Sequence, residues 1–354
     1  MNAVKADRSM SNRSQNAQKA SAPVEAIAVA APAATLPPPS TVRRLLVKLG
    51  PDLVILLGFS LVLVALSIVY RAQLSYRDGS VVLPALSLLA ILVITFLFGP
   101  RKTFVERARA VVRDWLPFML LTMVYESLRT YTGLIRHVPI DPTLDQFDRQ
   151  IFGVSPTLWF QKLYHPLLTD YMAFAYVLYF AMPLAIIFLL YWRRRREDFR
   201  ELALSLVLCF YSGFLLYIIF PAGPPRFYEP MLKIFDPPQL TSYFGVFEAT
   251  TKAFDAANPI KVYASFPSLH CAIAMLAMVY AWRFRDVFRH KWILPAIYAP
   301  LVVSLWISTV YLRHHWVVDV WAGWALGFAC TVIAPIIRHK FQKMAESEGR
   351  TSFV

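Results

Sequence analysis

Long apolar segments alternate with short basic ones along most of the chain. A helix needs about 20 apolar residues to cross the hydrocarbon core of a bilayer, and several segments come close to that length. The pattern predicts an all-α, polytopic integral membrane protein, a bundle of about eight transmembrane helices. The predicted spans are residues 51–70, 81–99, 115–131, 169–192, 201–220, 266–283, 292–312 and 315–337.

The third predicted span carries two charges in its second half, Glu126 and Arg129. A charge at the bilayer centre costs about 2.5 to 3.5 kcal/mol on insertion scales. The two residues stand one helical turn apart, so they can pair with each other as a packing contact. Arg129 is also a candidate for binding an anionic substrate group.

Lys and Arg gather in clusters before the first predicted span and after the second, fourth, sixth and eighth. All of these clusters fall on one side of the membrane, and cytoplasmic loops carry the excess of positive charge. We therefore predict that both termini are cytoplasmic and that the two long loops, residues 132–168 and 221–265, face outward. The outward loops contain no Asn-x-Ser/Thr sequon, which favours a bacterial inner membrane over a secretory organelle.

The two ends of the chain differ from its middle. Residues 1–44 are rich in Ala, Pro, Ser, Asn and Gln and lack apolar periodicity, which predicts a disordered cytoplasmic tail. Residues 45–338 would form the transmembrane domain, and residues 339–354 a second cytoplasmic tail. The pattern does not predict an oligomeric state.

Composition supports this class of protein. Hydrophobic residues make up 57% of the chain and charged residues only 16%, against about 25% charged in typical soluble proteins. The net charge is +14, but its clusters lie where membrane topology requires them, so nucleic-acid binding is not predicted. Cys209, Cys271 and Cys330 stand singly in apolar segments, which predicts neither a disulfide framework nor a metal site.

The stretch between the last two spans, Tyr311 to Asp319, concentrates ionisable side chains. His315 and Asp319 stand four residues apart, so they share one face if a helix begins here. A carboxylate in that position can orient a histidine for chemistry. The alternative is a structural hydrogen bond that tightens the start of the helix.

Two further polar elements reach the same outward rim. Arg226 follows Pro-Pro just after the fifth span, and Ser268 and His270 open the sixth. Helix N-termini expose free N–H groups that favour anions, phosphate above all, and Ser268 suits a capping position. Separately, Arg226 could contact lipid head groups and His270 could be an interfacial histidine, but their convergence favours a phosphate-handling site.

The order of these elements resembles the type 2 phosphatidic acid phosphatase superfamily. The second motif of that family is Pro-Ser-x-His, and residues 267–270 read Pro-Ser-Leu-His. Its third motif ends in His-x-x-x-Asp, which matches His315 and Asp319. Ser308 stands seven residues before His315, where the family has its serine. The resemblance covers roughly residues 140–337.

Two departures from the family pattern indicate a particular branch. Thr309 stands where the family has an arginine, and the first motif is reduced to Arg226 with no lysine seven residues earlier. Pro-Pro before the first motif, and His314 with Trp316 around the third, look more like the branch that contains fungal inositol phosphorylceramide synthases. This branch consists of inositolphosphotransferases of sphingolipid metabolism.

The resemblance implies a role for each candidate residue. His315 would be the nucleophile that forms phosphohistidine, and Asp319 would fix its tautomer. His270 would serve first as general acid and then as base. Arg226 would hold the phosphate oxygens, helped by Arg313 and by backbone N–H groups near Ser268. This chemistry requires no cofactor or metal, although a metal site built from the histidines stays open.

Three functions remain compatible with the sequence. A lipid phosphotransferase would move a phospho-alcohol head group, such as phosphoinositol, from a phospholipid to a lipid hydroxyl. An extracytoplasmic lipid phosphate or polyprenyl pyrophosphate phosphatase would use the same residues with water as acceptor. A transporter could use His315, Asp319, Glu126 and Arg129 as an intramembrane relay, although no related half-repeats are visible.

Overall fold

The computed structural model describes residues 41–74, parts of 84–91, 104–132, 134–257 and 263–349. The chain divides into two units, Met1–Pro39 and Ser40–Val354. The first unit, and with it most of the predicted tail at 1–44, lies outside the described residues, as does most of the predicted span at 81–99.

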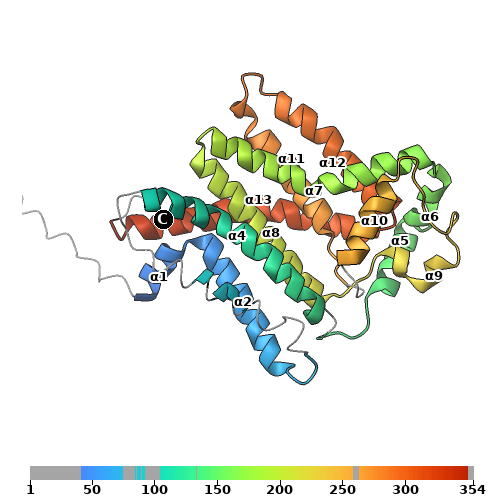
Figure 1. The fold of residues 1–354 in the computed structure, drawn as a ribbon, viewed down its shortest axis with the longest axis horizontal. Helices are drawn as coiled ribbons and strands as arrows, with labels where there is room; N and C mark the ends of the chain where they lie inside the picture. Colours follow the sequence, from blue (N-terminus) through green and yellow to red (C-terminus); the bar gives the residue numbers. More distant parts are fainter. Residues whose placement is uncertain are drawn as a thin grey trace, which may run out of the picture. The chain divides into compact units, whose positions relative to one another are not determined.

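The described chain is helical, as predicted (Figure 1). The other seven predicted spans all coincide with helices. The α-helices are α1 (Thr41–Leu49), α2 (Pro51–Val69), α4 (Phe104–Tyr131), α5 (Asp141–Phe152), α6 (Pro156–Phe160), α7 (Pro166–Trp192), α8 (Arg196–Ile219), α9 (Glu229–Leu232), α10 (Val246–Ala257), α11 (Leu269–Arg283), α12 (Ile293–Tyr311) and α13 (Val317–Glu346). Short 3-10 turns are η2 (Gln161–Leu163), η3 (Pro225–Phe227) and η4 (Arg285–Val287).

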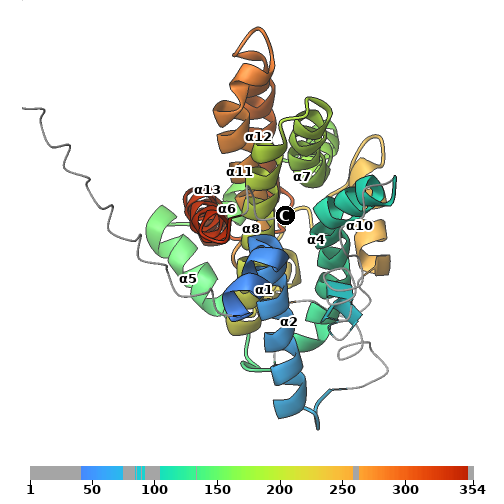
Figure 2. The ribbon, with the colours of Figure 1, turned by 90° about the vertical axis from the view of Figure 1, so that its left-hand side faces the viewer.

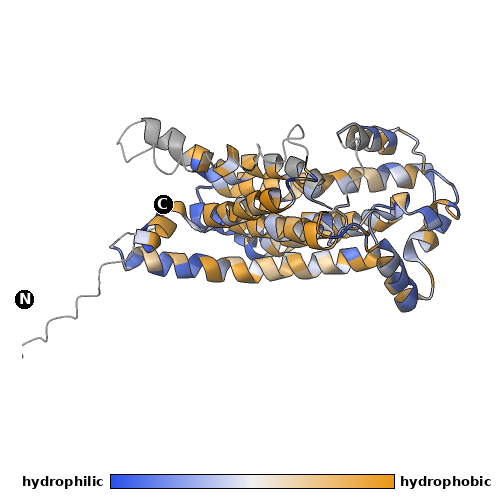
Figure 3. Ribbon diagram, turned by 90° about the horizontal axis from the view of Figure 1, so that it is seen from below, coloured by the Kyte–Doolittle hydropathy of each residue, from blue (hydrophilic) through white to orange (hydrophobic). Residues whose placement is uncertain are grey.

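Five of the described helices are long and apolar enough to cross a membrane: α2, α7, α8, α12 and α13. The chain is therefore an integral membrane protein by length and composition of its helices. Apolar residues cover the bundle along its length, whereas polar residues gather at the helix ends and in the short helices (Figure 3). Helix α13 continues to Glu346, nine residues beyond the predicted end of the last span.

Helix α11 lies at the centre of the bundle although it is shorter than its neighbours, with 15 residues. It packs against α7, α8, α12 and α13, which surround it in the end-on view of Figure 2. The short helices α5, α6, α9 and α10 gather at one end of the bundle (Figure 1). We call this the loop end, and it contains both long loops of the sequence.

Two glycines of α13 bring α11 and α13 into backbone contact. A Cβ atom on Gly323 would lie 2.4 Å from the carbonyl oxygen of Ser268, and one on Gly327 would lie 2.3 Å from that of Ala272. Any other residue would force the helices apart. Small residues four apart allow such close packing between membrane helices, and this contact fixes the separation of the two helix starts at the loop end.

Candidate active site

Two helices start side by side at the loop end, and each start carries one of the predicted histidines. Ser268 is the N-cap of α11, as predicted, and its side chain accepts a hydrogen bond from the N–H of Cys271 at 3.3 Å. The N–H of Ser268 itself donates to the carbonyl oxygen of Asp319 at 3.0 Å. This bond ties the start of α11 to the first turn of α13, so that His315 Nε2 lies 3.4 Å from His270 Nδ1.

The predicted contact between His315 and Asp319 is present. His315 Nδ1 lies 3.3 Å from Asp319 Oδ2, and both side chains are buried, with Asp319 fully inaccessible to solvent. The same oxygen accepts the N–H of Trp316 at 3.1 Å, which caps the start of α13. Asp319 Oδ1 is buried and has no hydrogen-bond partner among the described residues. A carboxylate at this site favours the tautomer with the proton on Nδ1, which leaves the lone pair on Nε2.

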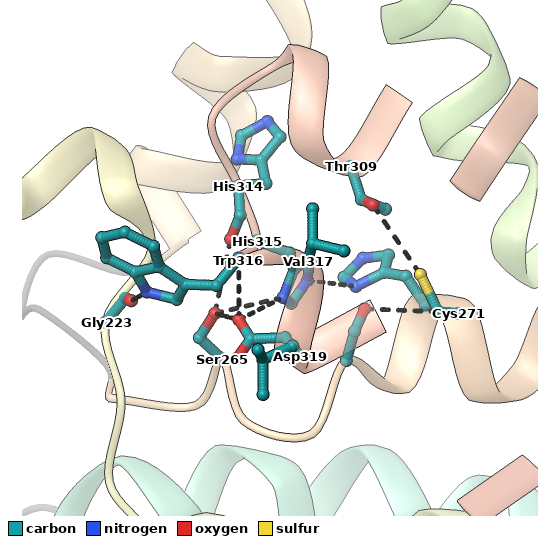
Figure 4. A network of polar contacts seen from close by, with 12 residues as sticks. Gly223, Ser265, Cys271, Thr309, His314, His315, Trp316, Val317 and Asp319 are labelled. Atoms are coloured by element: carbon teal, nitrogen blue, oxygen red, sulfur yellow. Dashed lines mark hydrogen bonds and ion pairs between the residues drawn. The ribbon is translucent and has the colours of Figure 1, made fainter. Parts of the chain in front are cut away.

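Ser265 completes this arrangement (Figure 4). Its hydroxyl donates to Asp319 Oδ2 at 2.9 Å and lies 3.1 Å from His315 Nδ1. With its own proton on Asp319, the Ser265 oxygen can accept the Nδ1 proton of His315, which is then shared between the serine and the carboxylate. Ser265 is held in turn by its own N–H, which donates to the carbonyl oxygen of Ala222 at 2.9 Å.

Two tyrosines of α7 pack against the rings of His270 and His314. The ring of Tyr176 stacks on His270, with centroids 4.4 Å apart, and on His314 at 4.6 Å. Tyr179 lies against His270 at 4.1 Å. These contacts restrict the orientation of His270, which is half-buried.

Arg226 lies in η3, the short turn that follows the Pro-Pro dipeptide. Its N–H donates to the carbonyl oxygen of Arg313 at 3.1 Å, which fixes this turn beside the start of α13. The side chain is half-buried, with its guanidinium over the ring of Phe227 at 4.5 Å. The pKa of His314 is well below its usual value because of burial and, next, because of the positive charge of Arg226. The Arg226 charge therefore acts on His314, the residue next to His315 in the chain.

Two other predicted residues make contacts away from the paired histidines, and the side chain of a third lies outside the described residues. The guanidinium of Arg313 donates to the carbonyl oxygens of Pro237 and Pro238, so it is directed to a loop and away from the paired histidines. The Ser308 hydroxyl is buried and donates back to Leu305 O at 2.7 Å within its own helix. Arg129 belongs to α4, but its side chain lies outside the described residues.

Sequence reasoning missed two neighbours of the pair, Ser265 and Asp148. Asp148 of α5 is fully buried, and its two carboxylate oxygens accept the N–H groups of Val317 and Val318 at 2.9 and 3.1 Å. Burial raises the pKa of this carboxyl to about 6. Its acidic neighbourhood in the outward loop was visible in the sequence, but its role as a cap of α13 was not. Ser265 carries no signal beyond its place before the Pro-Ser-x-His motif.

In the part of the chain that the structure describes, no group of three or more His, Cys, Asp or Glu side chains is arranged to hold a metal ion. The polar groups that converge are two imidazoles, one carboxylate, one hydroxyl and a nearby guanidinium. This set is suited to nucleophilic attack by an imidazole on an anionic electrophile.

Comparisons with known proteins agree with this chemistry. A phosphoinositol dihydroceramide synthase from Bacteroides thetaiotaomicron is 27% identical over 238 residues, which cover 62% of this chain and 73% of that protein. The catalytic subunit of inositol phosphorylceramide synthase from Schizosaccharomyces pombe is 28% identical over 134 residues, or 36% of this chain and 30% of that protein. No solved structure matches. The model of the PAP2 superfamily matches residues 143–333, which contain both histidine motifs, and the chain belongs to that superfamily.

Proposed function

We propose that the protein is a membrane lipid phosphotransferase, which moves a phospho-alcohol head group such as phosphoinositol from a phospholipid to the hydroxyl of an acceptor lipid. The observation that carries this proposal is the His315 imidazole, whose Nδ1 is held by Asp319 and whose Nε2 faces His270. Both relatives are named for ceramide products that bear inositol phosphate, which supports transfer over hydrolysis.

The first step is attack by His315 on the phosphorus of the donor lipid. The Nε2 lone pair forms the N–P bond while the bond from phosphorus to the diacylglycerol oxygen breaks. His270 gives its proton to that oxygen, so that diacylglycerol leaves neutral. The imidazolium charge that develops on His315 is stabilised by Asp319, and the head group remains attached as phosphohistidine.

The second step reverses these roles. The hydroxyl of the acceptor lipid attacks phosphorus, its proton passes to His270, and the N–P bond breaks to regenerate neutral His315. Arg226 is the guanidinium that holds the phosphoryl oxygens in both steps, because its turn is fixed against the start of α13. Charge-assisted contacts that tighten as charge develops lower the barrier in each direction.

We also propose where the reaction takes place. Among the described residues, the basic clusters at 193–196, 283–291 and 338–343 lie at the ends of their helices opposite to the loop end. This supports our assignment of the loop end to the extracytoplasmic face. With the bacterial relative in mind, we assign the protein to a bacterial inner membrane. The substrates then come from the outer leaflet of that membrane.

The test uses purified protein in detergent with head-group-labelled phosphatidylinositol or phosphate-labelled phosphatidic acid, each with and without a ceramide or diacylglycerol acceptor. Label that moves from phosphatidylinositol onto the acceptor supports the proposal. Release of free phosphate from phosphatidic acid, independent of acceptor, would indicate a phosphatase instead.

The covalent step has its own test. His315→Ala should abolish the acid-labile labelled protein that forms when donor is added without acceptor, with unchanged expression and helix content. Arg149→Gln is a suitable control, because Arg149 pairs with Asp145 on the exposed face of α5. Full turnover in His315→Ala would refute phosphohistidine as the intermediate.

A further inference from the structure

One segment of the second long loop is attached to the bundle at both of its ends. This segment, residues 233–247, lies between α9 and the first turn of α10, and we call it the strap. Near its start, the Arg313 guanidinium donates to Pro238 O at 3.1 Å and to Pro237 O at 2.9 Å. The same guanidinium lies over the ring of Phe235 at 3.9 Å.

The far end of the strap is bound by Asp170, in the first turns of α7. Its Oδ2 accepts the N–H groups of Tyr243 and Phe244, each at 2.7 Å. Its Oδ1 accepts the N–H of Val246 at 3.0 Å. A carboxylate that accepts three backbone N–H groups makes strong, charge-assisted bonds, so Asp170 fixes the backbone of this part of the strap.

Apolar contacts also place the strap against residues that flank the reactive histidine in the chain. Leu240 packs in one buried cluster with Tyr311 and Leu312, just before His315 in the chain. Phe235 packs in another with Trp316, just after it. The strap therefore covers the short connection between α12 and α13 from which His315 projects.

Arg313 joins the strap to the phosphate-handling residues. Its carbonyl oxygen holds the N–H of Arg226, while its side chain holds the strap. Its backbone has a φ of 62°, a left-handed conformation that a non-glycine residue adopts at a cost and keeps only when its surroundings enforce it. Because the bond to Arg226 is made by the backbone of Arg313, a substitution of the Arg313 side chain loosens the strap and leaves the contact with Arg226 in place.

We propose that the strap, fastened by Arg313 and Asp170, determines whether phosphohistidine reacts with a lipid hydroxyl or with water. This inference rests on the proposed function. Both outcomes begin with the same intermediate. Attack by a lipid hydroxyl gives the transferred product, whereas attack by water gives free alcohol phosphate, with the proton passing to His270 and the N–P bond breaking in both.

The physical reason is access of water to the intermediate. Water is by far the more abundant nucleophile at an outward-facing site, so transfer requires that bulk water be kept from the phosphorus. The strap packs on the residues that flank His315 in the chain, at the end of the bundle that we assign to the aqueous side. The acceptor lipid would instead approach from within the membrane. Arg313 and Asp170 are thus positioning residues. They affect which nucleophile reaches the intermediate, and they do not affect the attack by His315 that forms it.

The experiment measures two products from head-group-labelled phosphatidylinositol with a ceramide acceptor: label on the acceptor lipid and label released into water. Asp170→Asn and Arg313→Lys loosen the strap at its two ends without changing its length. We expect total donor cleavage within about threefold of wild type and a ratio of release to transfer at least about tenfold higher. Arg149→Gln, which alters an exposed ion pair on α5, should leave the ratio unchanged.

The two proposals fail in different ways. If wild-type protein transfers label and both variants keep its product ratio while total cleavage falls, the strap has only a structural role and the inference is overturned. If wild-type protein releases label into water and never transfers it, the proposed function itself is overturned. The two variants lie at opposite ends of the strap. If one of them misfolds, the product ratio of the other still tests the inference.

Discussion

Ser265→Ala tests the hydrogen-bond arrangement around the nucleophile most directly. The substitution removes a buried hydroxyl that donates to Asp319 Oδ2 at 2.9 Å and lies 3.1 Å from His315 Nδ1. A hydrogen bond to a charged group contributes about 1.5 to 3 kcal/mol. If that stabilisation is greatest when His315 becomes charged, loss of the hydroxyl lowers kcat by about 10- to 150-fold, since 1.36 kcal/mol corresponds to a factor of ten.

The assay follows single-turnover formation of labelled phosphoenzyme and steady-state transfer, because Ser265 should affect the chemical step and leave KM nearly unchanged. Ser205→Ala is the matched control. Ser205 is also fully buried and its hydroxyl lies 2.6 Å from the Tyr280 hydroxyl, but it belongs to the half of α8 farther from the loop end. It should lose some thermal stability and keep its kcat.

A kcat of Ser265→Ala within twofold of wild type would refute the reasoning. It would mean that Asp319 alone holds the Nδ1 proton and that the serine is merely a packing residue. A loss confined to KM would likewise contradict a role in orienting the nucleophile.

The remaining predictions concern the carboxylates and the helix contact. Asp319→Asn should lower kcat at least about 100-fold with KM within about threefold, because an amide cannot stabilise the imidazolium; a loss confined to substrate binding would contradict this role. Gly327→Ala puts a Cβ atom 2.3 Å from Ala272 O, so α11 and α13 must separate by about 1 Å, and a shift of that size can cost about 100-fold in rate. Gly58→Ala, whose Cβ would meet nothing within 4 Å, is its control, and equal rates for the two would contradict the close packing. Burial raises the pKa of Asp148 to about 6, so its contribution to folding stability is present below about pH 4 and lost as the pH rises through about 6. The Tm of wild type minus that of Asp148→Asn should therefore fall over this range and stay flat above it, and the opposite slope would contradict the burial.

Regular patterns in the sequence predicted the helices and the contact between His315 and Asp319. The length of the apolar segments predicted the spans, because a segment that crosses the bilayer must hydrogen-bond its own backbone N–H and C=O groups and therefore forms a helix. The spacing of His315 and Asp319 gave their contact, because residues four apart on a helix are neighbours whatever surrounds them. The start of α11 at Ser268 followed from local capping chemistry in the same way.

Positions decided by distant packing could not be predicted. Arg313 was expected at the phosphate, but its guanidinium is bound to two proline carbonyls some 75 residues earlier in the chain. Asp148 caps a helix 169 residues later. Neither partner is marked by periodicity or spacing, since such contacts depend on how the loops cross the end of the bundle.

The glycine contact between α11 and α13 has a consequence for how substrates enter. Where backbone meets backbone, no rotamer can yield, so these two helices move as one rigid body that carries both histidines. Lipids must nevertheless reach a site that is buried among helices. The movement that admits them must therefore come from helices that meet this pair through side chains. Among the described helices, α7 carries the tyrosines that rest on His270 and His314, so its displacement would uncover the reactive groups.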